Sequence, residues 1–153
     1  MIYVYGAGMP GSIEEALLNI RRILPGCNVL LVRTELAVPE LLYFSLFSSL
    51  KAFQEGTNRA RSVELEWACR LACEGNVATA LKRTTPVGGK MAIATDMQVD
   101  KSDFQSMGIT EEIKKGGTPD AKFLAEFYGI KKEALKNYDI IDLAREKMAT
   151  CVV

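Results

Sequence analysis

The sequence predicts three helices in succession between residues 36 and 90, with no strand among them. We expect these helices at Pro39–Glu55, Val63–Glu74 and Val77–Arg83, because helix-capping residues precede the last two and glycine or proline follows each of the three. A doubly wound parallel sheet would instead need a strand soon after residue 36. The run therefore points to a small sheet covered by many helices.

Strands and further helices are expected on either side of this run. β-branched and apolar runs predict strands at Ile2–Tyr5, Asn28–Arg33 and Lys90–Thr95. The continuous apolar character of residues 28–33 is typical of an interior strand. Further helices are expected from Ile13 to about Arg22, at Lys101–Met107, at Ala121–Tyr128 and at Asp142–Met148. We therefore predict one helix-rich domain, residues 1–153, of α/β class (α+β-like), with a small β-sheet packed against several helices.

The helix at Pro39–Glu55 is predicted to be the central buried helix. Its apolar residues recur at helical spacing, and the expected stripe consists of Leu42, Leu46, Leu50 and Phe53, widened by Tyr43 and Phe47. The apolar run Leu41–Leu50 contains three serines and is too short to span a bilayer. With no basic segment before the first apolar residues, we expect a soluble cytoplasmic protein with no membrane partner.

The absence of histidine excludes much chemistry. With none among 153 residues, the chain cannot form a Ser-His-Asp or Cys-His pair or a histidine-ligated metal site. The four cysteines have no zinc-like spacing and are expected to be free thiols. No pair of carboxylates has a visible set of partners for acid–base or metal chemistry. We therefore expect no catalytic residues, no metal and no cofactor.

A glycine-rich turn offers one alternative function. Gly6, Gly8 and Gly11 match G-x-G-x-x-G between an expected strand and an expected helix, and Glu35 follows the next strand. Such a turn can direct backbone amides at a pyrophosphate. The sequence supplies too few strands for a dinucleotide fold, so a flexible strand-to-helix turn is favoured. A small dinucleotide-binding protein using these glycines remains the alternative.

The basic residues concentrate in one segment of a chain whose formal net charge is zero. Residues 51–90 hold seven lysines and arginines against four acids, whereas residues 96–120 hold three lysines against six acids. The centre of the basic segment is the loop Asn58–Arg61. Helix N-termini expected at Ser62 and Asn76 flank it and would add amide donors for phosphate. From composition, this loop is either a solvated charged loop or a phosphate contact.

Residues 51–83 combine a helix end, a basic loop and two short helices in a characteristic order. The features in question are Lys51-Ala52, Gly56, Asn58, Arg61, Glu66, Gly75-Asn76 and Ala80-Leu81. This segment resembles the PRPK-binding protein family (TPRKB-like), whose members are the small accessory subunit of the KEOPS/EKC complex. Residues 139–153 look like that family's C-terminal helix.

The resemblance implies a non-catalytic subunit that binds a PRPK-type atypical kinase and, through it, the other KEOPS subunits. That complex helps place the threonylcarbamoyl group on tRNA, and archaeal members are thought to hold the single-stranded acceptor end. The expected tRNA-binding residues are Lys51, Asn58, Arg59, Arg61, Lys82 and Arg83. Glu66 is expected either to hold Arg61 in an ion pair or to contact a partner. A stand-alone single-stranded RNA-binding domain is the other alternative.

Overall fold

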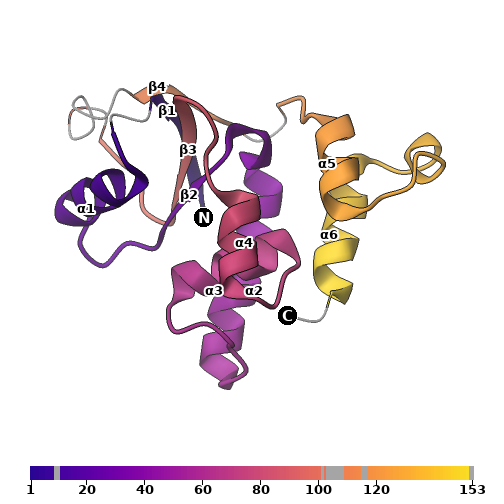
Figure 1. The fold of residues 1–153 in the computed structure, drawn as a ribbon, viewed down its shortest axis with the longest axis horizontal. Coiled ribbons are helices and arrows are strands. Elements are labelled where there is room, and N and C mark those ends of the chain that lie inside the picture. The colour runs from indigo at the N-terminus through magenta and orange to yellow at the C-terminus, as the bar shows by residue number, and fades with distance from the viewer. Residues whose placement is uncertain (9–10, 101, 103–108, 115–116, 152–153) are drawn as a thin grey trace.

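A four-stranded antiparallel sheet forms the centre of the fold (Figure 1). The computed structural model describes residues 1–153 apart from 9–10, 101, 103–108, 115–116 and 152–153. The strands are β1 (Tyr3–Gly8), β2 (Val29–Val32), β3 (Lys90–Thr95) and β4 (Ile109–Glu112), in the spatial order β2-β3-β1-β4. The predicted single α/β domain with a small sheet and many helices is confirmed.

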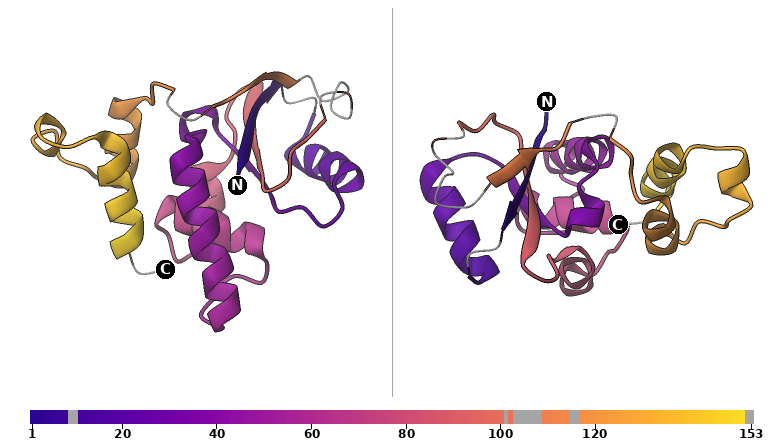
Figure 2. Two further views of the ribbon diagram at one scale, coloured as in Figure 1. Left: turned by 180° about the vertical axis from the view of Figure 1, so that it is seen from behind. Right: turned by 90° about the horizontal axis from the view of Figure 1, so that it is seen from above.

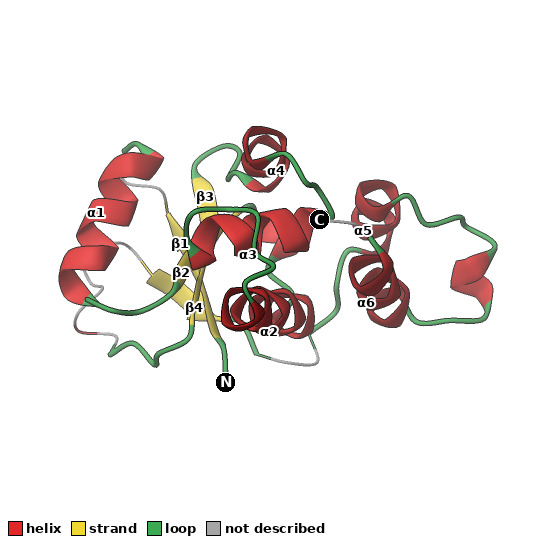
Figure 3. Cartoon of the chain, turned by 90° about the horizontal axis from the view of Figure 1, so that it is seen from below, coloured by secondary structure: helices red, strands yellow, loops and turns green. Residues whose placement is uncertain are grey.

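The helices cover both faces of this sheet. They are α1 (Ile13–Ile23), α2 (Pro39–Glu55), α3 (Val63–Ala72), α4 (Val77–Thr84), α5 (Ala121–Tyr128) and α6 (Ile140–Thr150). Short 3-10 turns lie at Thr34–Leu36 and Ala134–Lys136. Figure 3 shows the strands between α1 on one side and α2 and α3 on the other. The sequence therefore folds into three layers, with the helical run of residues 39–84 packed on one side of the sheet.

Strand β2 is buried on both faces but lies at an edge of the sheet. Leu30 and Val32 join the larger core with α2 and α3, and Val29 and Leu31 join the smaller core with α1. The prediction of an interior strand was therefore wrong, because a helix layer on each face buries an edge strand as thoroughly as neighbouring strands would.

Strand β1 runs further than predicted. Gly6 does not end it, because Gly6, Ala7 and Gly8 pair with residues 92–90 of β3, and the register with β4 shifts between Gly6 and Ala7. A glycine at such an irregularity lets the backbone kink without ending the ladder. Strand β4 was not predicted, and most of the helix expected at Lys101–Met107 lies outside the described residues.

The predicted helix starts are confirmed by their caps. The side chains of Ser12, Ser62 and Asn76 each accept a hydrogen bond from a backbone N–H in the first turn of α1, α3 and α4. Helix α3 ends two residues earlier than predicted. Cys73 takes the left-handed conformation, with φ of 51°, and terminates the helix before Gly75.

Helix α2 buries a different face from the one predicted. Leu42 and Leu46 are buried as expected, but Ser45 and Ser49 complete the buried face, because each hydroxyl donates to a carbonyl one turn earlier. The side chains left largely in solvent are Tyr43, Phe47 and Leu50. Packing against α3 rather than hydrophobicity alone decides this, since Trp67 of α3 donates its indole N–H to the Leu42 carbonyl over 3.1 Å.

Helices α5 and α6 pack beside α2, away from α1 (Figure 2). The Tyr128 hydroxyl at the end of α5 donates to the Leu71 carbonyl over 2.7 Å and so joins α5 to α3. Within the described part of the chain, no helix combines the length and apolarity that a membrane span requires.

Candidate functional site

The loop between α2 and α3 is held in place by one buried carboxylate. Glu66 is fully buried in α3, and its Oε2 accepts the backbone N–H groups of Arg59 and Ala60, each over 2.9 Å. Its other oxygen, Oε1, accepts the Nε–H of Arg70 over 2.9 Å. Glu66 therefore fixes the loop through its backbone and leaves the arginine side chains of the loop unused.

This arrangement corrects the expected pairing of Glu66 with Arg61. The ion-pair partner is Arg70, which lies one helical turn further along α3. Arg61 is exposed, and within the described residues it forms no ion pair. A signal was present in the sequence, because Glu66 and Arg70 stand four residues apart in a predicted helix.

The charge of Glu66 is stabilised despite its burial. Removal from water raises the pKa of this carboxyl, but the N–H groups of Ala60 and Arg59 and the guanidinium of Arg70 lower it by more. The pKa of Glu66 is thus held below its ordinary value. A charged carboxylate behind the loop therefore holds the backbone of this segment at neutral pH.

The loop presents two arginines to solvent. Arg59 and Arg61 are both exposed, and neither guanidinium forms an ion pair with a described residue. The side chain of Arg59 extends to the α3–α4 turn at Gly75. Its Nη1 lies 3.2 Å from the position that a Cβ atom would take on this glycine. Asn58 stays within the loop and donates from its side-chain amide to the Ala60 carbonyl over 3.0 Å.

The other predicted tRNA-binding residues divide into two groups. Lys51 and Lys82 are exposed on α2 and α4, with Lys51 3.8 Å from Glu55 in a solvent-exposed pair. Arg83 instead turns inward. It donates to the Ala72 carbonyl over 2.6 Å and to the Phe127 carbonyl over 2.5 Å, and its guanidinium lies 4.3 Å from the centre of the Phe127 ring. Its donors are committed to holding α3, α4 and α5 together.

The glycine-rich segment has a different setting from a dinucleotide-binding turn. Gly6 and Gly8 lie within β1, and β3 is inserted between β1 and β2, so those two strands are not neighbours. Glu35, the acidic residue after β2 that completed the motif, pairs with Arg33 over 3.2 Å. A dinucleotide fold places its first two strands side by side and parallel. The geometry thus disfavours a pyrophosphate site at these glycines.

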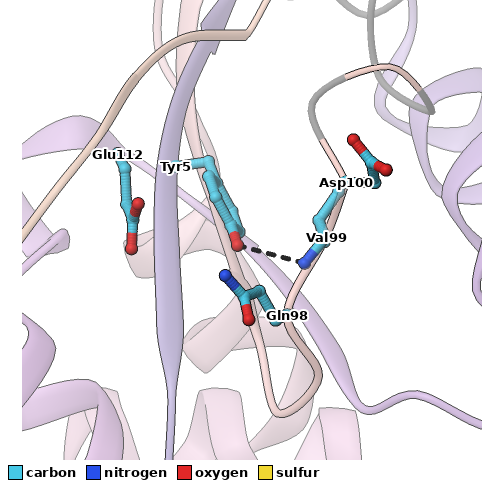
Figure 4. Close-up of a pocket in the computed structure, with 5 residues that line it drawn as sticks. All are labelled: Tyr5, Gln98, Val99, Asp100 and Glu112. Carbon is cyan, nitrogen blue, oxygen red and sulfur yellow. Dashed lines mark hydrogen bonds between the residues drawn. The ribbon is translucent and has the colours of Figure 1, made fainter.

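A hollow of about 460 Å³ opens beside β1 at Tyr5 (Figure 4). The Val99 N–H donates to the Tyr5 hydroxyl over 3.2 Å, while Asp100 and Glu112 lie on opposite sides of Tyr5. Burial raises the pKa of Tyr5, and the bond from Val99 offsets part of that rise. This hollow lies in the acidic part of the chain, residues 96–120, so it does not extend the positively charged surface of the loop Asn58–Arg61.

Comparison with known proteins adds no identification. The chain matches no model of a known protein family, and no curated protein matches it. The geometry of the loop and the resemblance of residues 51–83 are therefore the basis for assigning a function.

Proposed function

We propose that this chain is the non-catalytic accessory subunit of a KEOPS-type complex that modifies tRNA with threonylcarbamoyl-adenosine. In that role it binds a PRPK-type atypical kinase and holds the single-stranded acceptor end of tRNA, in the cytoplasm. The observation that carries the proposal is the loop anchored by Glu66, in the segment that resembles the family. It presents Arg59 and Arg61 to solvent on a backbone that is already ordered.

An ordered loop is well suited to phosphate contacts. Because the backbone at Arg59 and Ala60 is fixed by Glu66, binding RNA would order only the two arginine side chains. Guanidinium groups form paired hydrogen bonds with phosphate oxygens. The N-termini of α3 and α4 add positive partial charge on either side of the loop. We place Lys82 at the margin of this surface and leave Arg83 out, because its donors are used internally.

A second surface supports the binding of a protein partner. The exposed face of α2 carries Tyr43, Phe47 and Leu50, which are 44%, 57% and 41% exposed and follow one another at helical spacing. The rings of Tyr43 and Phe47 lie 6.5 Å apart and almost parallel. Aromatic side chains in such a stripe are typical anchors of protein interfaces. We assign the docking of the kinase to this face.

The test is gel filtration of the chain with the PRPK-type kinase of the same organism, with and without its tRNA. We expect a stoichiometric complex that retains tRNA. Separate elution of the two proteins at concentrations of tens of micromolar would contradict the kinase assignment, since roughly this range is that of the dissociation constants of weak transient complexes. RNA retained by the chain alone, with no kinase bound, would favour a stand-alone RNA-binding domain.

The variant Arg61→Glu tests the loop itself. We expect weaker tRNA binding and a salt dependence flatter by about one unit of slope, because one phosphate contact is lost. Lys132→Glu is the matched control, since Lys132 is also an exposed cation but belongs to the segment between α5 and α6, which lies far from the loop between α2 and α3 (Figure 1). Circular dichroism should show both variants folded. Equal tRNA affinity in the two variants would overturn the assignment of the loop.

A further inference from the structure

The outer edge of β2 forms the floor of an apolar groove. A cavity of about 220 Å³ lies along Val29, Leu30 and Leu31. Leu17 of α1 lines one wall, and Leu81 of α4 lines the other. Figure 3 shows the sheet between α1 and α3. Among the described strands, β2 is at the edge, with β3 as its one neighbour.

The direction of the backbone groups of β2 follows from its pairing with β3. The Asp96 N–H donates to the Asn28 carbonyl, so the even-numbered residues 28, 30 and 32 direct their N–H and C=O groups toward β3. Val29 and Leu31 therefore direct theirs into the groove. The Arg33 N–H, which shares this direction, donates to the Thr84 carbonyl over 2.9 Å and closes one end of the groove.

The edge formed by Val29 and Leu31 is both buried and unpaired. These residues are only 2% and 7% exposed, yet no described residue bonds to their outward N–H or C=O groups. Buried backbone groups are nearly always paired. Edge strands are also usually protected by charge, proline or a bulge, and residues 29–32 (VLLV) contain neither charge nor proline.

We propose that this groove binds an extended peptide segment of a protein partner, which adds to the sheet as a further strand beside β2. Main-chain bonds to Val29 and Leu31 would fix the segment. Successive side chains of an added strand point to opposite faces, toward α1 and toward α3 and α4. Since both walls are apolar, the central residues of the bound segment are apolar as well.

The charges at the rim define the rest of the ligand. Arg21 lines the groove from α1 and Glu64 lines it from α3, and neither forms an ion pair with a described residue. A bound segment with an acidic residue near Arg21 and a basic residue near Glu64 would complement both. This site goes beyond the proposed function, because it uses neither the arginine loop nor the exposed face of α2.

Amide hydrogen exchange of the whole chain, read by NMR, tests the proposal. The probe is a pool of blocked hexapeptides with glutamate first, lysine last, and valine, isoleucine, leucine or phenylalanine at the four positions between. In the free protein, the amides of Val29 and Leu31 should exchange faster than those of Leu30 and Val32. With the pool at about 1 mM, we expect exchange at Val29 and Leu31 to slow by at least about tenfold.

Two matched variants show whether the groove is responsible. Leu81→Glu places a charge in the wall, whereas Tyr138→Glu changes an exposed side chain (65% exposed, against 38% for Leu81) that lies outside both the groove and the exposed face of α2. The proposal is supported if the peptide pool no longer slows exchange at Val29 and Leu31 in the first variant but still slows it in the second. Unchanged exchange with the pool, or equal protection in both variants, would overturn it. Slower exchange at Val29 and Leu31 without peptide, increasing with protein concentration, would also overturn the proposal, because a second copy of the chain would then be the occupant. Slower exchange that only an RNA oligonucleotide produces would overturn it as well.

Discussion

At the scale of single residues, Glu66 links the interior of α3 to the exposed loop that precedes it. One oxygen of its carboxylate serves the loop backbone and the other serves Arg70. The side chain is fully buried, while that of Arg70 is 24% exposed. An amide in its place would keep one acceptor oxygen and present an NH2 donor, so either the loop N–H groups or the Arg70 guanidinium would lose its acceptor.

We predict that Glu66→Gln lowers the free energy of unfolding by about 2–4 kcal/mol, because a buried, fully bonded charge is replaced by an amide that also carries donors. Urea denaturation at pH 7, followed by circular dichroism, measures the loss. Glu64→Gln, in the same turn of α3, is the control and should change stability by less than about 0.5 kcal/mol. Equal effects in the two variants would contradict the anchoring role.

The lowered pKa of Glu66 also predicts how the stability of the chain depends on pH. Because the pKa of Glu66 is lower in the folded chain than its ordinary value of 4.5, its contribution is present above that value and is lost as the pH falls through the folded pKa. Stability should therefore fall more steeply below pH 4.5 in the natural chain than in Glu66→Gln. Parallel curves for the two proteins in this acid range would show that Glu66 is not the titrating group.

At the scale of elements, α2 has two faces with different tasks. One face packs on the sheet and on Trp67, and the other exposes the stripe of Tyr43, Phe47 and Leu50. We predict that Phe47→Glu leaves the unfolding free energy within about 0.5 kcal/mol, because the ring is largely solvated already. The same change should weaken kinase binding by at least about tenfold, as loss of an aromatic anchor does.

Isothermal titration calorimetry with the kinase measures this loss. Tyr138→Glu serves as the control, since Tyr138 is an aromatic residue that is 65% exposed but lies outside α2. Kinase affinity that is unchanged by Phe47→Glu, or that falls equally in both variants, would remove α2 from the interface.

The elements also show what could be predicted from the sequence. Helix starts were predictable because capping is a local interaction, as the bonds at Ser12, Ser62 and Asn76 confirm. The edge position of β2 was not predictable, because an apolar sequence indicates that a strand is buried but does not indicate how many strands lie beside it. The exposed stripe of α2 was misjudged for a similar reason. Phe47 and Leu50 are as apolar as the buried leucines, and the positions of the elements that pack on α2 separate the two faces.

The site was predictable in part. The two loop arginines stood out through local charge and nearby helix starts, and the structure places both in solvent, with Arg59 beside Gly75. The Glu66–Arg70 pair could be found from its spacing, but the backbone partners of Glu66 and Arg83 could not, because their positions depend on tertiary packing. Arg83, for example, bonds to a carbonyl of Phe127, 44 residues away.

At the scale of the whole molecule, Arg83 ties the C-terminal helices to the rest of the fold. It lies near the end of α4, donates to the end of α3 at Ala72, and donates to α5 at Phe127. Its neighbour Lys82 points into solvent on the same helix. Of these two adjacent cations, Arg83 holds the molecule together, and Lys82 is left for the RNA contact that we propose.

We predict opposite outcomes for these neighbours. Arg83→Ala should lower the free energy of unfolding by about 2–3 kcal/mol, because two carbonyls lose a charged donor and the ring of Phe127 loses its cation. Lys82→Ala should change it by less than about 0.5 kcal/mol but reduce tRNA affinity modestly, since a cation at the margin of the loop is lost. Urea denaturation and tRNA binding at two salt concentrations, measured on the same samples, separate the effects. If Arg83→Ala stayed folded and lost more tRNA affinity than Lys82→Ala, Arg83 would belong to the RNA-binding surface, and its bonds to Ala72 and Phe127 would not be its main role.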